Sequence, residues 1–334
     1  MELIAGDIGG THSRLAWVTG DGATRPARRF ERDYPSAAFA TADDLIRQFI
    51  GDAGAPASPD SLLLAVPGPV ASQHVALTNL DWRLDAADMR ASLGIARVRF
   101  INDFQAAATG VTMLGPDDVI TLNAQSVETD GVRVVTGAGT GLGLAYLLPG
   151  EAGGLRPYAS EGGHADFAPA DARQARLLER LRARHGHVSW ERVAAGLAMR
   201  DLYAFCCDEL GVPLPDAGPA DGAAVSARAA AGDAAANAAL DLFVDLFAAW
   251  AGNVALLFQP RGGLFLVGGV AAHLETRLRA PRFMAVAADK GRMRGVVERT
   301  PVFLVTNPRL GVEGAIATGW AAHQFPYLQH RSGI

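Results

Sequence analysis

The first half of the chain alternates short apolar runs with amphipathic stretches, which is the pattern of an α/β protein. The apolar runs predict strands at residues 3–5, 13–18, 27–34, 61–66, 98–101, 132–136 and 142–148. Helical spacing of apolar residues predicts helices at 40–51 and 104–111. The strands at 61–66 and 98–101 are expected to be buried, because neither shows a clearly polar face.

The second half is mostly helical by the same criterion. The pattern predicts helices at about 171–185, 189–208, 223–230 and 234–258, strands at 264–267 and 302–305, and a closing helix at 311–323. The stretch 211–222 is rich in Pro, Gly and Ala and predicts a loop. The helix at 234–258 is long and apolar, but Asp241 and Asp245 lie four residues apart on one face. We therefore expect a core helix and no membrane span.

Three glycine-rich turns, each placed after an apolar run, are the most informative feature of the pattern. They read Gly6-Asp7-Ile8-Gly9-Gly10-Thr11, Gly137-Ala138-Gly139-Thr140-Gly141-Leu142-Gly143 and Gly268-Gly269. Glycine lets backbone N–H groups approach phosphate oxygens, so the three turns predict one phosphate-bearing ligand held from several sides. The first turn leads from strand into strand, unlike a Rossmann or P-loop turn, which leads into a helix. The strand–turn–strand unit occurs twice, which indicates a duplicated domain with the ligand in a cleft between the copies.

Composition and charge narrow the classes of function. The chain has 334 residues, 49% hydrophobic and 19% charged, which fits a soluble protein of two domains or lobes. Its net charge of −5 argues against a nucleic-acid or membrane partner, because both favour a basic surface. The arginines between Arg173 and Arg184 alternate with Ala and Leu at helical spacing, so we expect a solvated helix face there.

The cysteines and the start of the chain bear on the compartment. Cys206 and Cys207 are adjacent, a spacing at which disulfides are rare, and the sequence has no second cysteine cluster to complete a zinc site. We expect both thiols to be reduced in a helix, one buried and one partly exposed. Met1 leads directly into a strand with no leader pattern. These features predict a cytoplasmic protein.

Asp7 lies at the end of the first strand, beside Gly9, Gly10 and Thr11. A carboxylate next to a polyphosphate is repelled unless a cation lies between them. Asp7 is therefore the predicted residue for organising magnesium, in direct contact or through water. The alternative is a turn aspartate that caps its own backbone.

Asn102 and Asp103 follow the strand at 98–101 and precede a helix. One interpretation makes Asp103 the helix N-cap. In the other, the pair binds neighbouring hydroxyls, with Asp103 accepting a proton and Asn102 fixing the orientation. An ordinary aspartate pKa of about 3.9 makes a weak base. A weak base suffices for phosphoryl transfer with a loose transition state, because the proton leaves the hydroxyl late.

A third polar cluster, Glu161-Gly162-Gly163-His164, is followed by Glu191 near the start of a helix. With the Asn–Asp pair, these groups favour binding of a polyol ring, because carboxylates accept paired hydrogen bonds from vicinal hydroxyls. Two alternatives stay open. One is a metal site of His164 with Glu161 and Asp166, and the other is a capping role for Glu191 in a helix that starts at Ser189.

Together these motifs resemble those of bacterial ATP-dependent glucokinases of the hexokinase superfamily, outside the repressor-related branch. The resemblance runs nearly end to end, and its run from Glu161 to Pro169 is highly specific. The glycine turns alone would indicate only an actin-like ATPase fold. The motifs that carry it are Ala5-Gly6-Asp7-Ile8-Gly9-Gly10-Thr11, Leu77-Thr78-Asn79, Ile101-Asn102-Asp103-Phe104, Gly137-Ala138-Gly139-Thr140-Gly141-Leu142-Gly143, Glu161-Gly162-Gly163-His164-Ala165-Asp166-Phe167-Ala168-Pro169, Gly186-His187-Val188-Ser189-Trp190-Glu191-Arg192-Val193, Gly268-Gly269 and Asp289-Lys290-Gly291-Arg292.

The resemblance implies an α/β fold of the two-lobed, actin-like ATPase (ribonuclease H-like) type, with a cleft between a small and a larger domain. The small domain would comprise residues 1–107 with about 308–334, and the large domain 108–307. ATP and Mg²⁺ are the implied cofactors, with Asp7 as the residue nearest the metal. The residues implied to bind ATP are Gly6, Asp7, Ile8, Gly9, Gly10, Thr11, Gly137, Gly139, Thr140 and Gly141 for the phosphates, with Gly268 and Gly269 near the base.

The resemblance also implies an enzyme, a glucokinase that phosphorylates D-glucose at its 6-hydroxyl. By position, Asp103 is the catalytic base, and Asn102, Asp103, Glu161, His164 and Glu191 bind glucose hydroxyls. Closure of the cleft would exclude water from the reaction. The family is typically a cytosolic homodimer of glycolysis. Glucose, ATP and a second copy are thus the expected partners, with no nucleic acid and no membrane.

Three positions depart from the family pattern. His12 replaces the usual Asn after Gly-Gly-Thr and can still donate a hydrogen bond, while Ala195 and Ala198 replace the usual Ser and Gly. Three alternative functions remain: a non-catalytic sugar sensor or regulator on the same fold, an actin-like nucleotide switch, and a kinase for another hexose such as mannose or glucosamine. The repressor-related branch carries a Cys-rich zinc motif, which this sequence lacks.

Overall fold

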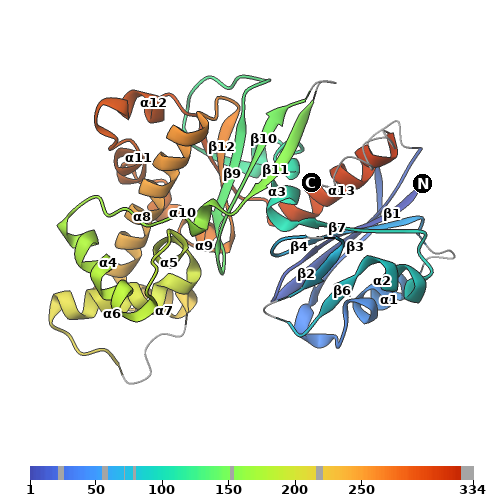
Figure 1. The fold of residues 1–334 in the computed structure, drawn as a ribbon, viewed down its shortest axis with the longest axis horizontal. Coiled ribbons are helices and arrows are strands. Elements are labelled where there is room, and N and C mark those ends of the chain that lie inside the picture. The colour runs from blue at the N-terminus through green and yellow to red at the C-terminus, as the bar shows by residue number, and fades with distance from the viewer. Residues whose placement is uncertain are drawn as a thin grey trace. The chain divides into compact units, whose positions relative to one another are not determined.

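The computed structural model describes residues 1–21, 26–54, 59–70, 72–77, 80–150, 154–215 and 221–324. The chain divides into two compact units, Met1–Gly115 with Asn307–Ile334, and Pro116–Thr306 (Figure 1). The predicted domain boundary at 107 falls inside helix α3 (Asp103–Gly110), which packs along α13 (Leu310–Gln324) within the first unit. The motif residues Thr78 and Asn79 lie outside the described residues.

The first unit is built on a five-stranded sheet in the order β3-β2-β1-β4-β7. Its strands are β1 (Glu2–Ile8), β2 (His12–Thr19), β3 (Ala27–Pro35), β4 (Ser61–Val66) and β7 (Arg97–Asn102). β2 pairs antiparallel with β1 and β3, whereas β4 pairs parallel with β1 and β7. The carboxyl ends of β1, β4 and β7 therefore lie at one edge of the sheet, which brings Asp7 and Asn102 to that edge.

Alternate residues of these strands serve two separate cores, because successive side chains point to opposite faces of a sheet. Ile4 and Ile8 of β1 pack in a cluster with α1 (Ala42–Asp52) and α2 (Ala86–Leu93). Leu3 and Ala5 pack in a second cluster with α3 and α13. Both faces of the sheet are thus covered by helices.

Helix α2 and the short hairpin of β5 (His74–Ala76) and β6 (Arg83–Asp85) are elements that the apolar pattern did not predict. The signals for α2 lie in its ends. The Asp85 side chain accepts hydrogen bonds from the N–H groups of Ala87 and Asp88, and Gly94 ends the helix in the left-handed conformation. Capping residues therefore locate this helix better than its weak apolar periodicity does.

The second unit is built on a six-stranded sheet in the order β11-β10-β9-β12-β13-β8. Its strands are β8 (Val119–Asn123), β9 (Arg133–Ala138), β10 (Leu142–Pro149), β11 (Leu155–Ser160), β12 (Gly263–Val267) and β13 (Val302–Val305). β9 pairs antiparallel with β10 and parallel with β12. The second and third glycine turns therefore leave neighbouring strands at the same edge.

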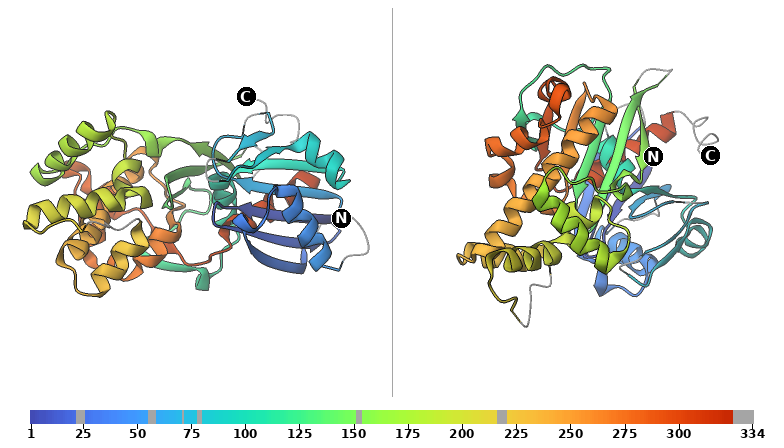
Figure 2. Two further views of the ribbon diagram at one scale, coloured as in Figure 1. Left: turned by 90° about the horizontal axis from the view of Figure 1, so that it is seen from below. Right: turned by 60° about the vertical axis from the view of Figure 1, so that its left-hand side comes forward.

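Most of the helices belong to the second unit, and Figure 2 shows them in two further views. They are α4 (Ala172–His185), α5 (Glu191–Ala194), α6 (Met199–Leu210), α7 (Gly222–Ala230), α8 (Ala234–Phe258), α9 (Gly269–His273), α10 (Glu275–Leu278), α11 (Pro281–Ala287) and α12 (Arg294–Glu298). The short 3₁₀ helices among the described residues are η1 (Ser36–Ala38), η2 (Pro116–Asp118), η3 (Gly162–His164), η4 (Gly196–Ala198) and η5 (Gly291–Met293).

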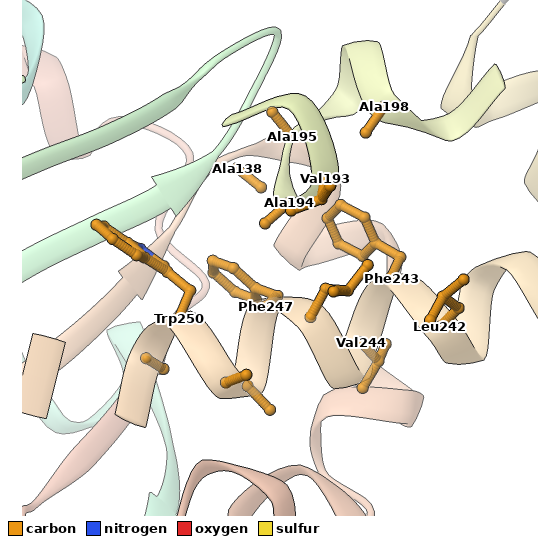
Figure 3. Close-up of a cluster of buried hydrophobic side chains, with 14 of the residues drawn as sticks. Ala138, Val193, Ala194, Ala195, Ala198, Leu242, Phe243, Val244, Phe247 and Trp250 are labelled. Atoms are coloured by element: carbon orange, nitrogen blue, oxygen red, sulfur yellow. The ribbon is translucent and has the colours of Figure 1, made fainter. Parts of the chain in front are cut away.

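Helix α8 forms the centre of the second unit. It is long and apolar enough to cross a membrane, but 72% of its most apolar window is buried inside the protein, as befits the core helix predicted from the sequence. Figure 3 shows Phe243 and Phe247 of α8 projecting toward Val193 and Ala194 of α5. The core helix thereby supports the segment that carries Glu191.

The helix predicted at 189–208 is broken in the structure, which corrects that prediction. Helix α5 ends at Ala194, Ala195 adopts an extended conformation, and the chain passes through η4 before α6 begins. The cause is a long-range contact: the Gly196 N–H donates to the Gly139 carbonyl at 2.8 Å. Ala195 and Ala198 are fully buried at this break (Figure 3), so these two departures from the family pattern face the core.

Of two expectations about side chains in the second unit, one is wrong and one is confirmed. Cys206 and Cys207 are both fully buried, so the partial exposure expected for one of them is wrong. Burial raises the pKa of the Cys206 thiol to about 11, which keeps it protonated at neutral pH. The arginine face of α4 is solvated, as expected, with side chains 35% to 58% exposed, and these arginines also pair with carboxylates of α6. The pairs are Arg173–Glu209, Arg176–Glu209, Arg180–Asp208 and Arg184–Asp201.

Candidate active site

The first glycine turn is shorter than the sequence motif, because β1 continues to Ile8 and leaves Gly9 to Thr11 as the turn. Gly6 lies within the strand, where a Cβ would come within 2.5 Å of Leu15 Cδ2. Ile8 is buried in the core. Packing alone therefore explains Gly6 and Ile8, and their nucleotide contacts stay a prediction.

The turn from Gly9 to Thr11 is held firmly by its surroundings. The Gly9 N–H donates to the His12 carbonyl at 3.0 Å, and a Cβ at Gly9 would lie 2.8 Å from that same oxygen. Ser36 braces the turn from η1, since its Oγ donates to the Gly9 carbonyl at 2.6 Å and its N–H to the Thr11 carbonyl at 3.0 Å. Gly10 lies inside this braced turn, which fits a fixed phosphate cradle. Nothing in the sequence pattern pointed to Ser36.

Asp7 is the charged group closest to this turn along β1. Its Oδ2 lies 3.9 Å from Arg14 Nη1 on β2, and a Cβ at Gly311 would come within 2.6 Å of the same oxygen. Burial raises the pKa of the Asp7 carboxyl, Arg14 opposes that shift, and the charge of Asp33 adds to it. Asp7 pairs with Arg14 in the strand ladder, so the turn-capping alternative is not realised.

The donor set around Asp7 fits Mg²⁺ only if most ligands come from elsewhere. Within the part of the chain that the structure describes, no group of three or more His, Cys, Asp or Glu could hold a metal ion. Mg²⁺ commonly binds to one or two carboxylates, with substrate phosphates and water completing its octahedron. A lone carboxylate beside a phosphate-type turn meets that pattern.

Replacing Asp7 with asparagine is expected to stabilise the nucleotide-free protein at neutral pH. The raised pKa means that ionised Asp7 costs folding energy, and this cost appears as the pH rises through the folded-state pKa. We expect the Asp7→Asn midpoint of thermal unfolding to lie ~2 °C above wild type at pH 7, the shift that about 1 kcal/mol produces. The advantage should shrink toward acidic pH, where wild-type Asp7 is protonated. A variant that is less stable than wild type at pH 7 would contradict this assignment.

Asn102 and Asp103 have different roles at the start of α3: Asn102 caps the helix, and Asp103 is its first residue. The Asn102 Oδ1 accepts from the N–H groups of Phe104 at 3.0 Å and Gln105 at 3.1 Å, so Asn102 is the N-cap and the alternative of Asp103 as N-cap is wrong. The Asn102 Nδ2 donates to the Gly68 carbonyl at 3.0 Å. An amide nitrogen has a second N–H, so Asn102 can still donate to a ligand.

Asp103 is the first residue of α3, and its Oδ1 accepts from the Phe104 N–H at 2.9 Å. The carboxylate therefore sits in the first turn of a helix, where the helix dipole stabilises negative charge. Asn102 caps the helix without it. The arrangement suits a carboxylate that must stay ionised to accept a proton.

The second and third glycine turns lie against each other in the second unit. A Cβ at Gly137 would overlap the Val267 carbonyl, and one at Gly268, where φ is +100°, would lie 2.5 Å from the Ala138 carbonyl. These glycines serve the close approach of β9 and β12. Gly139 and Gly269 differ, because a Cβ there would meet no atom of the described residues within 4 Å. They leave open space of the kind that a phosphate or base needs, and Thr140 is exposed next to Gly139.

A buried hydrogen-bond chain anchors the base of the second turn. The Trp250 Nε1 donates to Thr136 Oγ1 at 2.8 Å, and Thr136 Oγ1 donates to the Gly143 carbonyl at 2.8 Å. Trp250 comes from the core helix α8, far away in the sequence. The chain of donors fixes both strands that flank the turn, and no local motif could have revealed it.

Glu161, His164 and Glu191 come together in the second unit, as predicted from their chemistry. His164 Nε2 lies 3.8 Å from Glu161 Oε2, and its Nδ1 lies 3.8 Å from Glu191 Oε1. The Glu161 and His164 side chains are 69% and 60% exposed, whereas that of Glu191 is 19% exposed. Two accessible polar groups beside a more buried carboxylate can bind a polyol.

The two alternatives for this cluster fail on geometry. Asp166 Oδ1 lies 2.6 Å from His187 Nε2, so Asp166 is engaged away from the proposed metal set. Helix α5 has no side-chain cap, and Glu191 directs its carboxylate to the Leu142 N–H at 3.0 Å instead of capping at Ser189. Backbone bonds from Phe167 to Val188 and from Trp190 to Ala165 hold the loop in place.

Comparisons with known proteins agree with this geometry. The family model described as Glucokinase matches residues 4–322. A glucokinase of Synechocystis sp. is 37% identical over 347 residues, covering 94% of this chain and 97% of the relative. The crystal structure of a glucokinase from an Antarctic psychrotroph is 30% identical with a TM-score of 0.82, covering 95% of this chain and 98% of that one.

A glucokinase of Balamuthia mandrillaris, solved in complex with glucose, is 23% identical with a TM-score of 0.76 and covers 94% of this chain and 92% of its own. At this level of identity, the similarity supports the fold alone. The expected actin-like ATPase fold is confirmed by these structural neighbours. On the match across residues 4–322 and the identity of its relatives, this chain belongs to the glucokinase family.

Proposed function

We propose that this enzyme transfers the terminal phosphoryl group of ATP to the 6-hydroxyl of D-glucose. The observation that carries the proposal is the direct bond between a sugar-type cluster and a phosphate-type turn. Glu191 contacts His164 on one side and the Leu142 N–H of the second glycine turn on the other. Such an arrangement holds a polyol and a phosphate donor close together.

Each of the remaining polar residues has one task in this proposal. Asp103 accepts the proton of the 6-hydroxyl late in the transfer, for which a weak base is sufficient. Glu161, His164 and Glu191 bind ring hydroxyls, and Asn102 orients the hydroxyl through its second amide N–H. A hexose that lacks one of these hydroxyls leaves a polar group unpaired and is therefore rejected.

The phosphate donor is assigned to the glycine turns. The first two turns hold phosphate oxygens through backbone N–H groups, and the open space at Gly269 receives the base. Asp7 would hold Mg²⁺, which when bound would neutralise charge on the phosphate oxygens. We further propose a cytoplasmic homodimer that acts in glycolysis, as the resemblance implies.

A coupled spectrophotometric assay with ATP, Mg²⁺ and a panel of hexoses tests this function. We expect glucose to give the highest kcat/KM and glucose 6-phosphate to be the product. Binding of glucose without turnover would point to a regulator on the same fold. A higher kcat/KM for mannose or glucosamine would point to a kinase for another hexose.

A further inference from the structure

The segment from Glu191 to Leu197 forms three hydrogen bonds with the second glycine turn. The Glu191 Oε2 accepts from the Leu142 N–H at 3.0 Å, and the Gly196 N–H donates to the Gly139 carbonyl at 2.8 Å. The Leu197 N–H donates to the Thr140 carbonyl at 3.4 Å. One short segment therefore contains Glu191, which is proposed to bind the sugar, and is hydrogen-bonded to the turn that is proposed to bind phosphate.

Gly141 sits at the tightest of these contacts. The atoms that a Cβ at Gly141 would meet within 4 Å, among the described residues, are Oε2 and Cδ of Glu191, and it would overlap Oε2. Gly141 does not have a positive φ, so its backbone does not itself demand glycine. The missing side chain at this position makes room for the Glu191 carboxylate.

Gly139, two residues earlier in the same turn, provides the contrast. It also lacks a positive φ, and a Cβ there would meet no atom within 4 Å in the part of the chain that the structure describes. This open space is available to a ligand. Two glycines of one turn thus serve different ends.

We infer that Gly141 is a positioning residue for the sugar, although it lies in the phosphate turn. It lets Glu191 bind the Leu142 N–H with one oxygen and present the other toward His164 and the sugar hydroxyls. The same contact couples the two substrates, because a phosphate that orders the turn also orders the Glu191 carboxylate. Such coupling is reciprocal, so sugar binding favours nucleotide binding by the same factor. This inference rests on the proposed function, in which Glu191 binds glucose.

Calorimetric titration of glucose into the nucleotide-free enzyme tests the inference, with Gly141→Ala and Gly139→Ala as a matched pair. We expect Gly141→Ala to weaken glucose binding about tenfold, because it displaces a charged hydrogen-bonding group. Gly139→Ala should leave nucleotide-free glucose affinity within about twofold while raising the KM for ATP. Equal effects of the two variants on glucose affinity would overturn the inference.

A double-mutant cycle separates positioning from a general disturbance of the fold. In a Glu191→Ala background, the methyl group of Ala at position 141 meets no carboxylate, so Gly141→Ala should change glucose affinity less than about twofold. A full tenfold loss in that background would show that the effect does not pass through Glu191. The fold is checked by comparing thermal unfolding midpoints of all variants.

Coupling is measured by repeating the glucose titrations in the presence of a non-hydrolysable ATP analogue. The analogue should tighten glucose binding in wild type, and that factor should fall toward one in Gly141→Ala. An unchanged factor in the variant would overturn the coupling. If wild-type enzyme binds no glucose under either condition, the proposed function itself fails, which is a different outcome from failure of the variants alone.

Discussion

Replacing Asp103 with asparagine is expected to lower kcat for glucose phosphorylation by about a thousandfold, the middle of the range for a general base. Glucose affinity should stay within about threefold of wild type, since the amide keeps the shape of the side chain and one acceptor oxygen. Steady-state assays give kcat, and calorimetry gives the glucose affinity. A kcat within tenfold of wild type would show that another group accepts the proton.

The local structure separates the chemical role of Asp103 from the capping of α3. Asn102 caps α3 with its own side chain, so the helix does not depend on Asp103 for its start. The Asp103 Oδ1 bond to the Phe104 N–H can be kept by an asparagine oxygen. Asn102→Ala is the matched control, because loss of the cap should cost about 1 kcal/mol of stability. Asp103→Asn should leave the unfolding midpoint nearly unchanged, which separates loss of chemistry from loss of structure.

The sequence predicted well those features that local patterns decide. Strands at 13–18 and 61–66, the core helix at 234–258 and the glycine turns all follow from apolar periodicity and composition. The cluster of Glu161, His164 and Glu191 was predicted from chemistry and is found together in the structure. Local spacing sufficed for the strands, the helix and the turns, because each of these is determined within its own stretch of chain, whereas the cluster was predicted from the chemistry of its side chains.

The features that the sequence missed depend on contacts between distant segments. Helix 189–208 breaks at Ala195 because Gly196 binds Gly139, and periodicity contains no sign of that partner. The hydrogen bond from Ser36 to the Gly9 carbonyl of the first turn was missed too, because its two partners are far apart in the sequence. Gly6 was assigned to the turn by its motif, although its packing against Leu15 places it in the strand. In each case the structure depends on a contact with a distant segment, which the pattern of neighbouring residues does not reveal.

The second large effect is expected on protein stability, from a substitution where α13 packs against α3. A Cβ at Gly314 would overlap the Ala106 carbonyl oxygen, and one at Gly110 would overlap the Leu310 carbonyl. Backbone atoms cannot move aside as a flexible side chain can, so we expect Gly314→Ala to cost about 3 kcal/mol, the upper part of the range for overpacking. Circular dichroism should show the unfolding midpoint falling by roughly 6 °C.

The control is the same substitution at an open helical site. Gly51 lies near the end of α1, and a Cβ there would meet no atom of the described residues within 4 Å, so Gly51→Ala should raise stability by about 0.5 kcal/mol. The position of Asp103 gives the sharper readout. Because α3 begins at Asp103, a displaced α3 also displaces the proposed base, and Gly314→Ala should lose kcat even at temperatures where it stays folded. Full kcat with lowered stability would show that α13 supports the fold without positioning the base.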